Sequence, residues 1–141
     1  MVDRLTPSRR SWLMSRVRGK NTTPELRVRK VAHALGLRFR IHRADLPGKP
    51  DIIFPSRRLA VFVHGCYWHR HPNCAKASAP SSSFWAKKFA SNVRRDLRVQ
   101  SELKSLGWKV VVIWECETKK PKALKSIVGR RIQSRKSANG R

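Results

Sequence analysis

The chain has 141 residues, and 33 Lys or Arg against 8 Asp or Glu give it a formal net charge of +25. Its apolar fraction of 40% suffices for a core and excludes a disordered basic tail as the whole molecule. No apolar run approaches the roughly 20 residues of a membrane span, and the N-terminus lacks the apolar segment of a secretory signal. We therefore expect a cytoplasmic protein without membrane contact, and the charge favours a polyanionic partner, above all nucleic acid.

Helices are predicted from capping residues and apolar periodicity. Thr23 is the predicted N-cap of a helix that has proline in its first turn and stops at Gly36. Ser83 is the predicted cap of a long helix, and Pro121 opens a last one. These signals predict helices over 8–18, 23–35 and 84–106, and another from residue 121 onward.

Strands are predicted between these helices. Residues 37–41 alternate apolar and basic side chains, which is typical of a half-buried strand. Short apolar segments over 51–54 and 59–64 predict two more strands, and 108–114, apolar on both faces, predicts a central one. The expected fold class is α/β, a small mixed sheet of about four strands flanked by helices. We expect one domain over 1–134 and a basic, disordered tail over 135–141.

Histidine and cysteine are concentrated in a long segment between two predicted elements. The eleven residues from His64 to Cys74 hold two of the three cysteines and three of the five histidines. An odd number of cysteines in a chain without a secretory signal favours a reducing compartment. Thiolates with imidazole are the set that zinc prefers, so a zinc ion is expected to pin this loop; the alternative is buried free cysteines.

The cluster holds more potential ligands than one zinc ion needs. The cysteines supply three thiolates, which leaves one place for His64, His69 or His71. A spare histidine is suited to act as a general base, because its ordinary pKa lies near 6.5. The residues alone leave open whether His69 or His71 has that role.

The position of Asp51 at the start of a predicted strand indicates a candidate metal site. Pro50 and Asp51 enter a strand, and the next strand ends at Val63 and His64, a spacing that resembles the Mg²⁺ site of the restriction-endonuclease-like fold. The alternative is that Asp51 is a turn residue. Glu25 is adequately explained as a first-turn helix acid. Four other acids are expected to be solvated surface charges: Asp45, Asp96, Glu102 and Glu117. The two remaining histidines, His33 and His42, are expected to be ordinary surface or half-buried residues.

Four segments together resemble the very-short-patch repair endonuclease family: LPGKPD, VFVHGCYWHRHPNC, FWAKKFASNVRRD and LGWKVVVIWEC. The similarity extends from Ser11, in RSWLMSRVRGKNTTPE, through Cys116. It implies a bacterial, nucleoid-associated enzyme of restriction-endonuclease-like fold. Such an enzyme would nick double-stranded DNA on the 5′ side of the thymine in a T:G mismatch that arises when 5-methylcytosine deaminates.

The resemblance also implies roles for individual residues. Asp51 matches the Mg²⁺-binding aspartate, His69 the catalytic histidine, His64 a supporting histidine and Glu25 the helix glutamate. The matches to the structural zinc ligands are Cys66, His71, Cys74 and Cys116. The matches to the aromatic wedge that enters the base stack are Tyr67, Trp68 and Trp85, with Met14 acting from the other groove.

The chain departs from the family pattern in a few positions. Val63 replaces a threonine of some members, so a Mg²⁺ ligand there would be the backbone carbonyl. Tyr67 replaces phenylalanine, and one extra residue lies between His71 and Cys74. Gly65 occupies the place of the lysine usual in the fold, which favours His69 as the base.

Other interpretations of these patterns remain open from the sequence. Tyr67 and Trp68 also suit core packing, and Trp85 also fits the apolar stripe of its helix. A non-catalytic, zinc-stabilised DNA-binding protein and a basic RNA-binding protein of ribosomal type are alternative functions. For the enzyme we expect a monomer, since nicking one strand needs one site, with mismatch-repair proteins as candidate partners.

Overall fold

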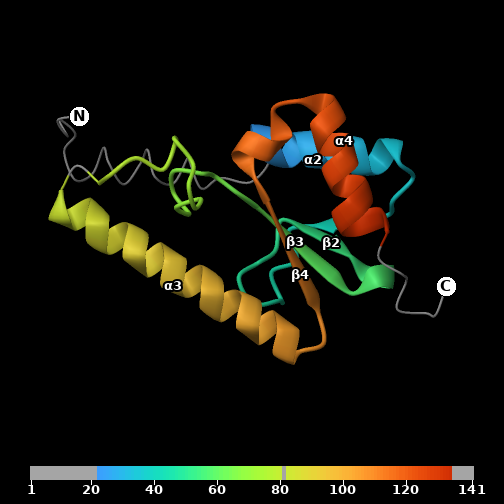
Figure 1. Ribbon diagram of the computed structural model, residues 1–141. Coiled ribbons are helices and arrows are strands. Elements are labelled where there is room, and N and C mark those ends of the chain that lie inside the picture. Colours follow the sequence, from blue (N-terminus) through green and yellow to red (C-terminus); the bar gives the residue numbers. More distant parts are fainter. Residues whose placement is uncertain (1–21, 81, 135–141) are drawn as a thin grey trace.

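The computed structural model describes residues 22–80 and 82–134 (Figure 1). The expected helix over 8–18, Met14 and the tail over 135–141 lie outside these residues. The helices and strands of the described part, in chain order, are α2 (Thr23–Ala34), β1 (Arg40–Ile41), β2 (Ile52–Phe54), β3 (Leu59–His64), α3 (Ser83–Ser105), β4 (Lys109–Trp114) and α4 (Pro121–Val128). Short turns of helix, η1 (Pro55–Arg57), η2 (Glu115–Thr118) and η3 (Gly129–Gln133), connect or extend them.

The four strands form one mixed sheet in the order β1-β2-β3-β4. β1 and β3 each pair antiparallel with β2, whereas β3 pairs parallel with β4 from Leu59↔Lys109 to His64↔Trp114. Parallel neighbours need a long crossover, and α3 supplies it. The predicted fold class, a small mixed sheet flanked by helices, is confirmed.

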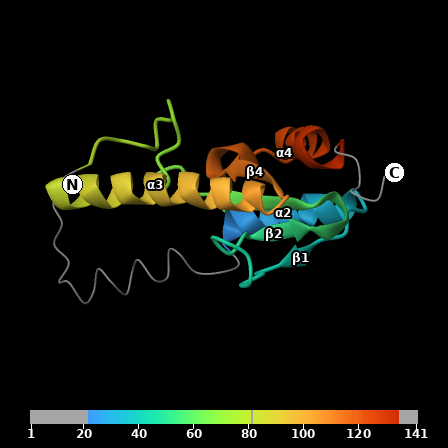
Figure 2. The ribbon, with the colours of Figure 1, turned by 90° about the horizontal axis from the view of Figure 1, so that it is seen from below.

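Helices cover both faces of the sheet (Figures 1 and 2). Because side chains alternate along a strand, Ile52 and Phe54 join the core beneath α2 and α4, and Ile53 joins the core beneath α3. In both views the N-terminal half of α3 extends past the sheet, alongside the segment 65–80. That half of the helix is therefore available to support a loop rather than a strand.

Two strand predictions were wrong in part. β4 lies at the edge of the described sheet, not in its centre. It is apolar on both faces because Val111 packs beneath α2 and α4 while Val110 packs toward α3. The strand predicted over 37–41 is reduced to Arg40 and Ile41, because Leu37 instead closes the end of α2, donating its N–H to the Ala32 carbonyl at 3.0 Å.

The helix caps lie one residue before the predicted ones. Thr22, not Thr23, accepts the hydrogen bond that caps α2, and Ser82, not Ser83, caps α3. Each cap is followed by a residue of the same type, so residue type alone does not separate them. Gly107, with a φ of +88°, ends α3 as predicted.

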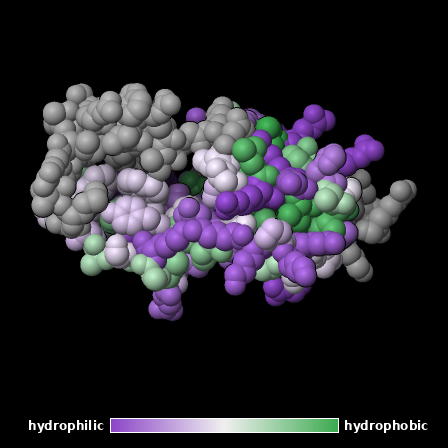
Figure 3. Space-filling view, turned by 90° about the horizontal axis from the view of Figure 1, so that it is seen from above, coloured by the Kyte–Doolittle hydropathy of each residue, from purple (hydrophilic) through white to green (hydrophobic). Residues whose placement is uncertain are grey.

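The described surface is mainly hydrophilic on the side seen from above, with a few apolar patches between the polar side chains (Figure 3). Among the described helices, none has both the length and the apolar character needed to span a membrane.

Candidate active site and metal centre

Two carboxyl groups come together where β2 begins. The Asp51 N–H donates to the Val61 carbonyl at 3.1 Å, and Asp51 Oδ2 accepts a 2.7 Å hydrogen bond from the Val63 N–H. Glu25, in the first turn of α2, is only 3% exposed and lies within hydrogen-bonding reach of Asp51. Burial raises the pKa of Asp51 to about 8; the Val63 N–H opposes this rise and the Glu25 carboxyl adds to it.

This pair fits a divalent cation that prefers oxygen ligands. Two ionised carboxylates at this range repel each other, and a cation between them removes that repulsion. The N–H and C=O of a strand residue point to the same side of the strand, so the Val63 carbonyl is on the side of Asp51. The ligand expected from Val63 is a backbone atom, which valine supplies as well as threonine does.

Glu25 also contacts two basic residues to which the sequence assigned no role. Its Oε2 accepts a hydrogen bond from Arg29, one turn along α2, and lies 3.4 Å from His42 Nε2. His42 follows β1 and is half-buried. Glu25 therefore contacts side chains beyond the first turn of its helix, and the half-buried His42 contacts a carboxylate of the candidate site.

A second cluster lies on the α3 side of the end of β3. The His64 and His69 rings stack at 3.9 Å, and His69 Nδ1 is 2.7 Å from Asp96 Oδ2 of α3. Burial lowers the pKa of His64 to about 3, with His69 as a second cause, so His64 is neutral. Asp96 was expected to be a solvated charge; that expectation was wrong, because its side chain is only 16% exposed and holds the ring of His69.

Both clusters contact the carboxyl end of β3. Val63 contacts Asp51 through its backbone, and the next residue, His64, stacks on His69. One strand end thus carries contacts to a carboxylate pair and to a histidine that an acid orients.

The four implied zinc ligands converge. One donor atom from each lies within 4.8 Å of the others, and the residues are Cys66, His71, Cys74 and Cys116. Burial raises the pKa of the Cys66 thiol to about 12, and the side chain of Cys116 adds to this rise. Three thiols and one imidazole form a closed set of the kind that holds structural zinc. His71 joins the cysteines, while His64 and His69 join Asp96.

The implied wedge residues form one half-buried aromatic cluster. Trp68 lies 5.2 Å from Tyr67 and 5.8 Å from Trp85, measured between ring centroids. Phe89 of α3, to which the sequence assigned no role in this cluster, contacts all three rings. The Arg70 guanidinium lies 4.4 Å from the Phe89 ring centroid and donates to the Ala77 carbonyl at 3.0 Å, which ties the loop to α3.

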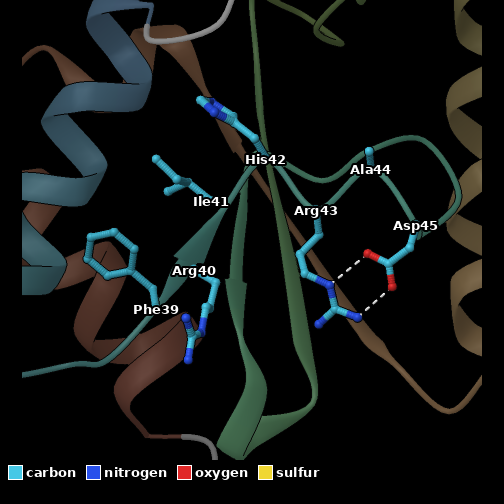
Figure 4. Close-up of a pocket in the computed structure, with 7 residues that line it drawn as sticks. All are labelled: Phe39, Arg40, Ile41, His42, Arg43, Ala44 and Asp45. Atoms are coloured by element: carbon cyan, nitrogen blue, oxygen red, sulfur yellow. Dashed lines mark hydrogen bonds and ion pairs between the residues drawn. The ribbon is translucent and has the colours of Figure 1, made fainter.

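Two hollows lie elsewhere on the described surface. One, of about 670 Å³, follows β1 and is lined by residues 39–45 (Figure 4). There Arg43 and the exposed Asp45 form a bidentate pair at 2.8 and 2.7 Å. The other, of about 360 Å³, lies between α2 and α4. Asp51 and His69 line neither of these two hollows.

Comparison with known proteins gives the family. The family model described as "DNA mismatch endonuclease Vsr" matches residues 2–76. The type II nicking enzyme V.XorIIP of Xanthomonas oryzae pv. oryzae is 53% identical over 119 residues, which cover 83% of this chain and 87% of the relative. The chain belongs to the Vsr family. It is a DNA endonuclease, and so a hydrolase whose substrate is DNA.

Two further Vsr relatives extend the match. DNA mismatch endonuclease Vsr of Escherichia coli is 39% identical over 118 residues, covering 82% of this chain and 75% of the relative. The type II nicking enzyme V.NmeAIP of Neisseria meningitidis serogroup A is 38% identical over 140 residues, covering 98% of this chain and 99% of the relative. The Vsr resemblance recognised in the sequence motifs is confirmed, and with it the endonuclease class.

Proposed function

We propose that the chain nicks double-stranded DNA on the 5′ side of the thymine in T:G mismatches, with Mg²⁺ at Asp51. The observation that supports this most is that the Asp51–Glu25 pair contacts Val63 and the His69–Asp96 pair contacts His64, the last two residues of β3. Phosphodiester hydrolysis needs stabilisation of charge on the phosphate and a base for the attacking water, and these two pairs are suited to the two tasks.

In this proposal Asp51 and the Val63 carbonyl hold the cation, with Glu25 behind them. When bound, Mg²⁺ supplies the polarisation of the scissile phosphate. His69 accepts the proton of the attacking water at Nε2, because Asp96 occupies Nδ1 and holds the ring in place. The neutral ring of His64, stacked on His69, limits rotation of that base.

Mismatch recognition is proposed to use the aromatic cluster. Tyr67, Trp68 and Trp85 would enter the base stack, as Met14 would from the other groove. A mismatch stacks poorly, so inserting a ring there costs less than in an intact duplex, where unstacking takes a few kcal/mol per step. The support is that half-buried rings from the loop and from the start of α3 form a cluster of their own outside the main core. Zinc at the Cys66 cluster would hold that loop in place.

A nicking assay on matched T:G and T:A duplexes, with and without Mg²⁺, tests the proposal. Asp51→Ala should abolish nicking of the T:G duplex while the zinc content and the circular dichroism spectrum stay unchanged. Asp45→Ala is the matched control, because Asp45 is an exposed acid paired on the surface with Arg43, and it should nick as the wild type does.

Each outcome of the nicking assay tests a separate part of the proposed function. Undiminished nicking by Asp51→Ala would remove Asp51 from the reaction, and equal cutting of both duplexes would refute T:G specificity. Mismatch binding without product in any divalent cation would favour the zinc-stabilised, non-catalytic DNA-binding protein.

A further inference from the structure

Two basic side chains from separate elements converge on one oxygen of Glu25. Arg29 donates to Glu25 Oε2 from the next turn of α2, and His42 Nε2 lies 3.4 Å from the same atom. The Arg29 Nη2 atom and His42 Nε2 are 3.2 Å apart, so the three groups contact one another. Their side chains are 4%, 14% and 20% exposed for Glu25, Arg29 and His42. This is a largely buried cluster, not a solvated pair on a helix surface.

The backbone of His42 is in a conformation that non-glycine residues rarely adopt. Its φ is +54°, and such strain persists where the surrounding structure requires it. Figure 4 shows the ring directed toward α2 and away from Arg43 and Asp45. The turn after β1 therefore delivers the imidazole to Glu25.

Arg29 shows a second sign of constraint. Its Nε atom is buried and has no hydrogen-bond partner among the described residues. A buried donor without a partner is unfavourable, and such groups are uncommon in folded proteins. The side chain is thus held where its terminal nitrogen reaches Glu25, although Nε has no partner in the part of the chain that the structure describes.

We propose that Arg29 and His42 are positioning residues that orient the Glu25 carboxylate toward Asp51 and so set the affinity of that pair for a divalent cation. The inference rests on the proposed cation site at Asp51. A glutamate side chain has several rotatable bonds, and ordering it on binding weakens binding. Arg29 donates to Oε2, and His42 donates to it in the tautomer that carries the proton on Nε2, so the carboxylate is already in place before the cation arrives.

Direct binding of Mn²⁺ to the full, zinc-loaded chain, measured by isothermal titration calorimetry without DNA or chelator, tests this inference. His42→Leu should weaken Mn²⁺ binding by about 10-fold, the usual size of an effect from residues that orient ligands. His42→Gln retains an N–H that can donate to Glu25 and should restore binding to near the wild-type value. Arg29→Met should also weaken binding by about 10-fold or more, although it removes a competing positive charge. His33→Leu is the control, since His33 is an exposed histidine of α2.

Nicking supplies a second readout. In His42→Leu the Mg²⁺ concentration for half-maximal nicking should rise, while kcat at saturating Mg²⁺ stays near the wild-type value. A change confined to kcat would overturn the inference, as would failure of His42→Gln to restore binding or tighter binding by Arg29→Met. Arg29 lies on α2 and His42 follows β1, so misfolding of one variant does not imply misfolding of the other. A single variant that folds is enough for the test.

Asp51→Asn separates this inference from the function on which it rests. If Asp51→Asn binds Mn²⁺ as well as the wild type does, the proposed cation site is wrong. If Asp51→Asn loses binding while His42→Leu and Arg29→Met bind as the wild type does, the cation site stands and only the positioning role is overturned.

Discussion

Asp96 lies in the middle of α3 and holds Nδ1 of His69 from there. A ring with one nitrogen held by a carboxylate keeps a fixed tautomer and presents the other nitrogen outward. Asn92, one turn earlier on α3, is buried and donates to the Trp68 carbonyl at 3.2 Å. The helix thus fixes the backbone just before His69 as well as its side chain, and both are needed to place a general base.

Asp96→Asn is expected to lower kcat for T:G nicking by about 100-fold, within the range that a positioned acid–base group contributes. The amide can offer its N–H to His69 Nδ1 and so favours the wrong tautomer, while the fold is preserved. Single-turnover nicking at saturating enzyme measures the effect. Glu102→Gln is the control. Glu102 is a half-exposed acid of the same helix, and its ion-pair partner among the described residues is Arg98. Wild-type rates in Asp96→Asn would show that His69 needs no acid partner.

At the scale of elements, the loop before β2 is held against α3 by a close approach of backbone and side chain. Gly48 has a φ of +71°, and a Cβ placed there would lie 2.2 Å from Val99 Cγ1. Leu46, in the same loop, packs into the core beneath α3. This contact sets the direction in which the chain enters β2, and hence the position of Asp51.

Gly48→Ala is therefore expected to lower the free energy of unfolding by about 2 to 4 kcal/mol, from left-handed strain together with overlap at Val99. Gly36→Ala separates the two causes. Gly36 has a similar φ of +75° but nothing within 4 Å of its added Cβ, so its cost should be about 1 kcal/mol. Urea unfolding followed by circular dichroism measures both. Equal losses in the two variants would show that the Val99 contact is unimportant.

The ends of helices were predictable where a nearby glycine or proline specifies them. Gly107 ends α3 and Pro121 opens α4 as the sequence indicates. The edge position of β4 was not predictable, because its apolar faces reflect helices that pack on it from both sides. Periodicity measures how much of a strand is covered and not which strand is its neighbour.

At the scale of the whole molecule, 33 basic residues stand against 8 acidic ones. Of the 8 acidic residues in the chain, Glu25 and Asp51 are the pair proposed to meet the cation. The remaining charge favours the DNA backbone in general, and the wedge proposed to sense the mismatch consists of uncharged rings. Affinity and discrimination should therefore respond differently to salt.

Binding of a T:A duplex is expected to fall by about 10³-fold or more between about 50 and 200 mM salt, as for proteins that make several phosphate contacts. The ratio of T:G to T:A affinity should change little over the same range, because insertion of aromatic rings releases no counterions. Fluorescence anisotropy measures both quantities, with the Asp51→Ala chain, which we expect to bind DNA without nicking it. A preference for T:G that collapses with salt would place mismatch recognition on charged side chains instead.

The candidate site was predictable where its residues lie together in the sequence or match family motifs. Three of the four proposed zinc ligands and the aromatic pair fall into one segment, so their residue types and spacing indicated them, whereas the choice of His71 came from the family motifs. Asp96 and His42 were misjudged because their partners lie 27 and 17 residues away. Such contacts arise only when α3 is placed over the loop and the turn after β1 is brought to α2, and no local pattern encodes either event.

The position of Cys116 has a consequence for the order in which the protein folds. Cys66 follows β3 and Cys116 follows β4, 50 residues apart in sequence, yet the Cys116 N–H donates to Cys66 Sγ at 3.4 Å. These two residues can meet only after the parallel strands have paired, which is a non-local and therefore slow event. The loop with the aromatic cluster would then be ordered last. The proposed zinc site, which needs Cys116, would therefore be completed only after β4 has paired with β3.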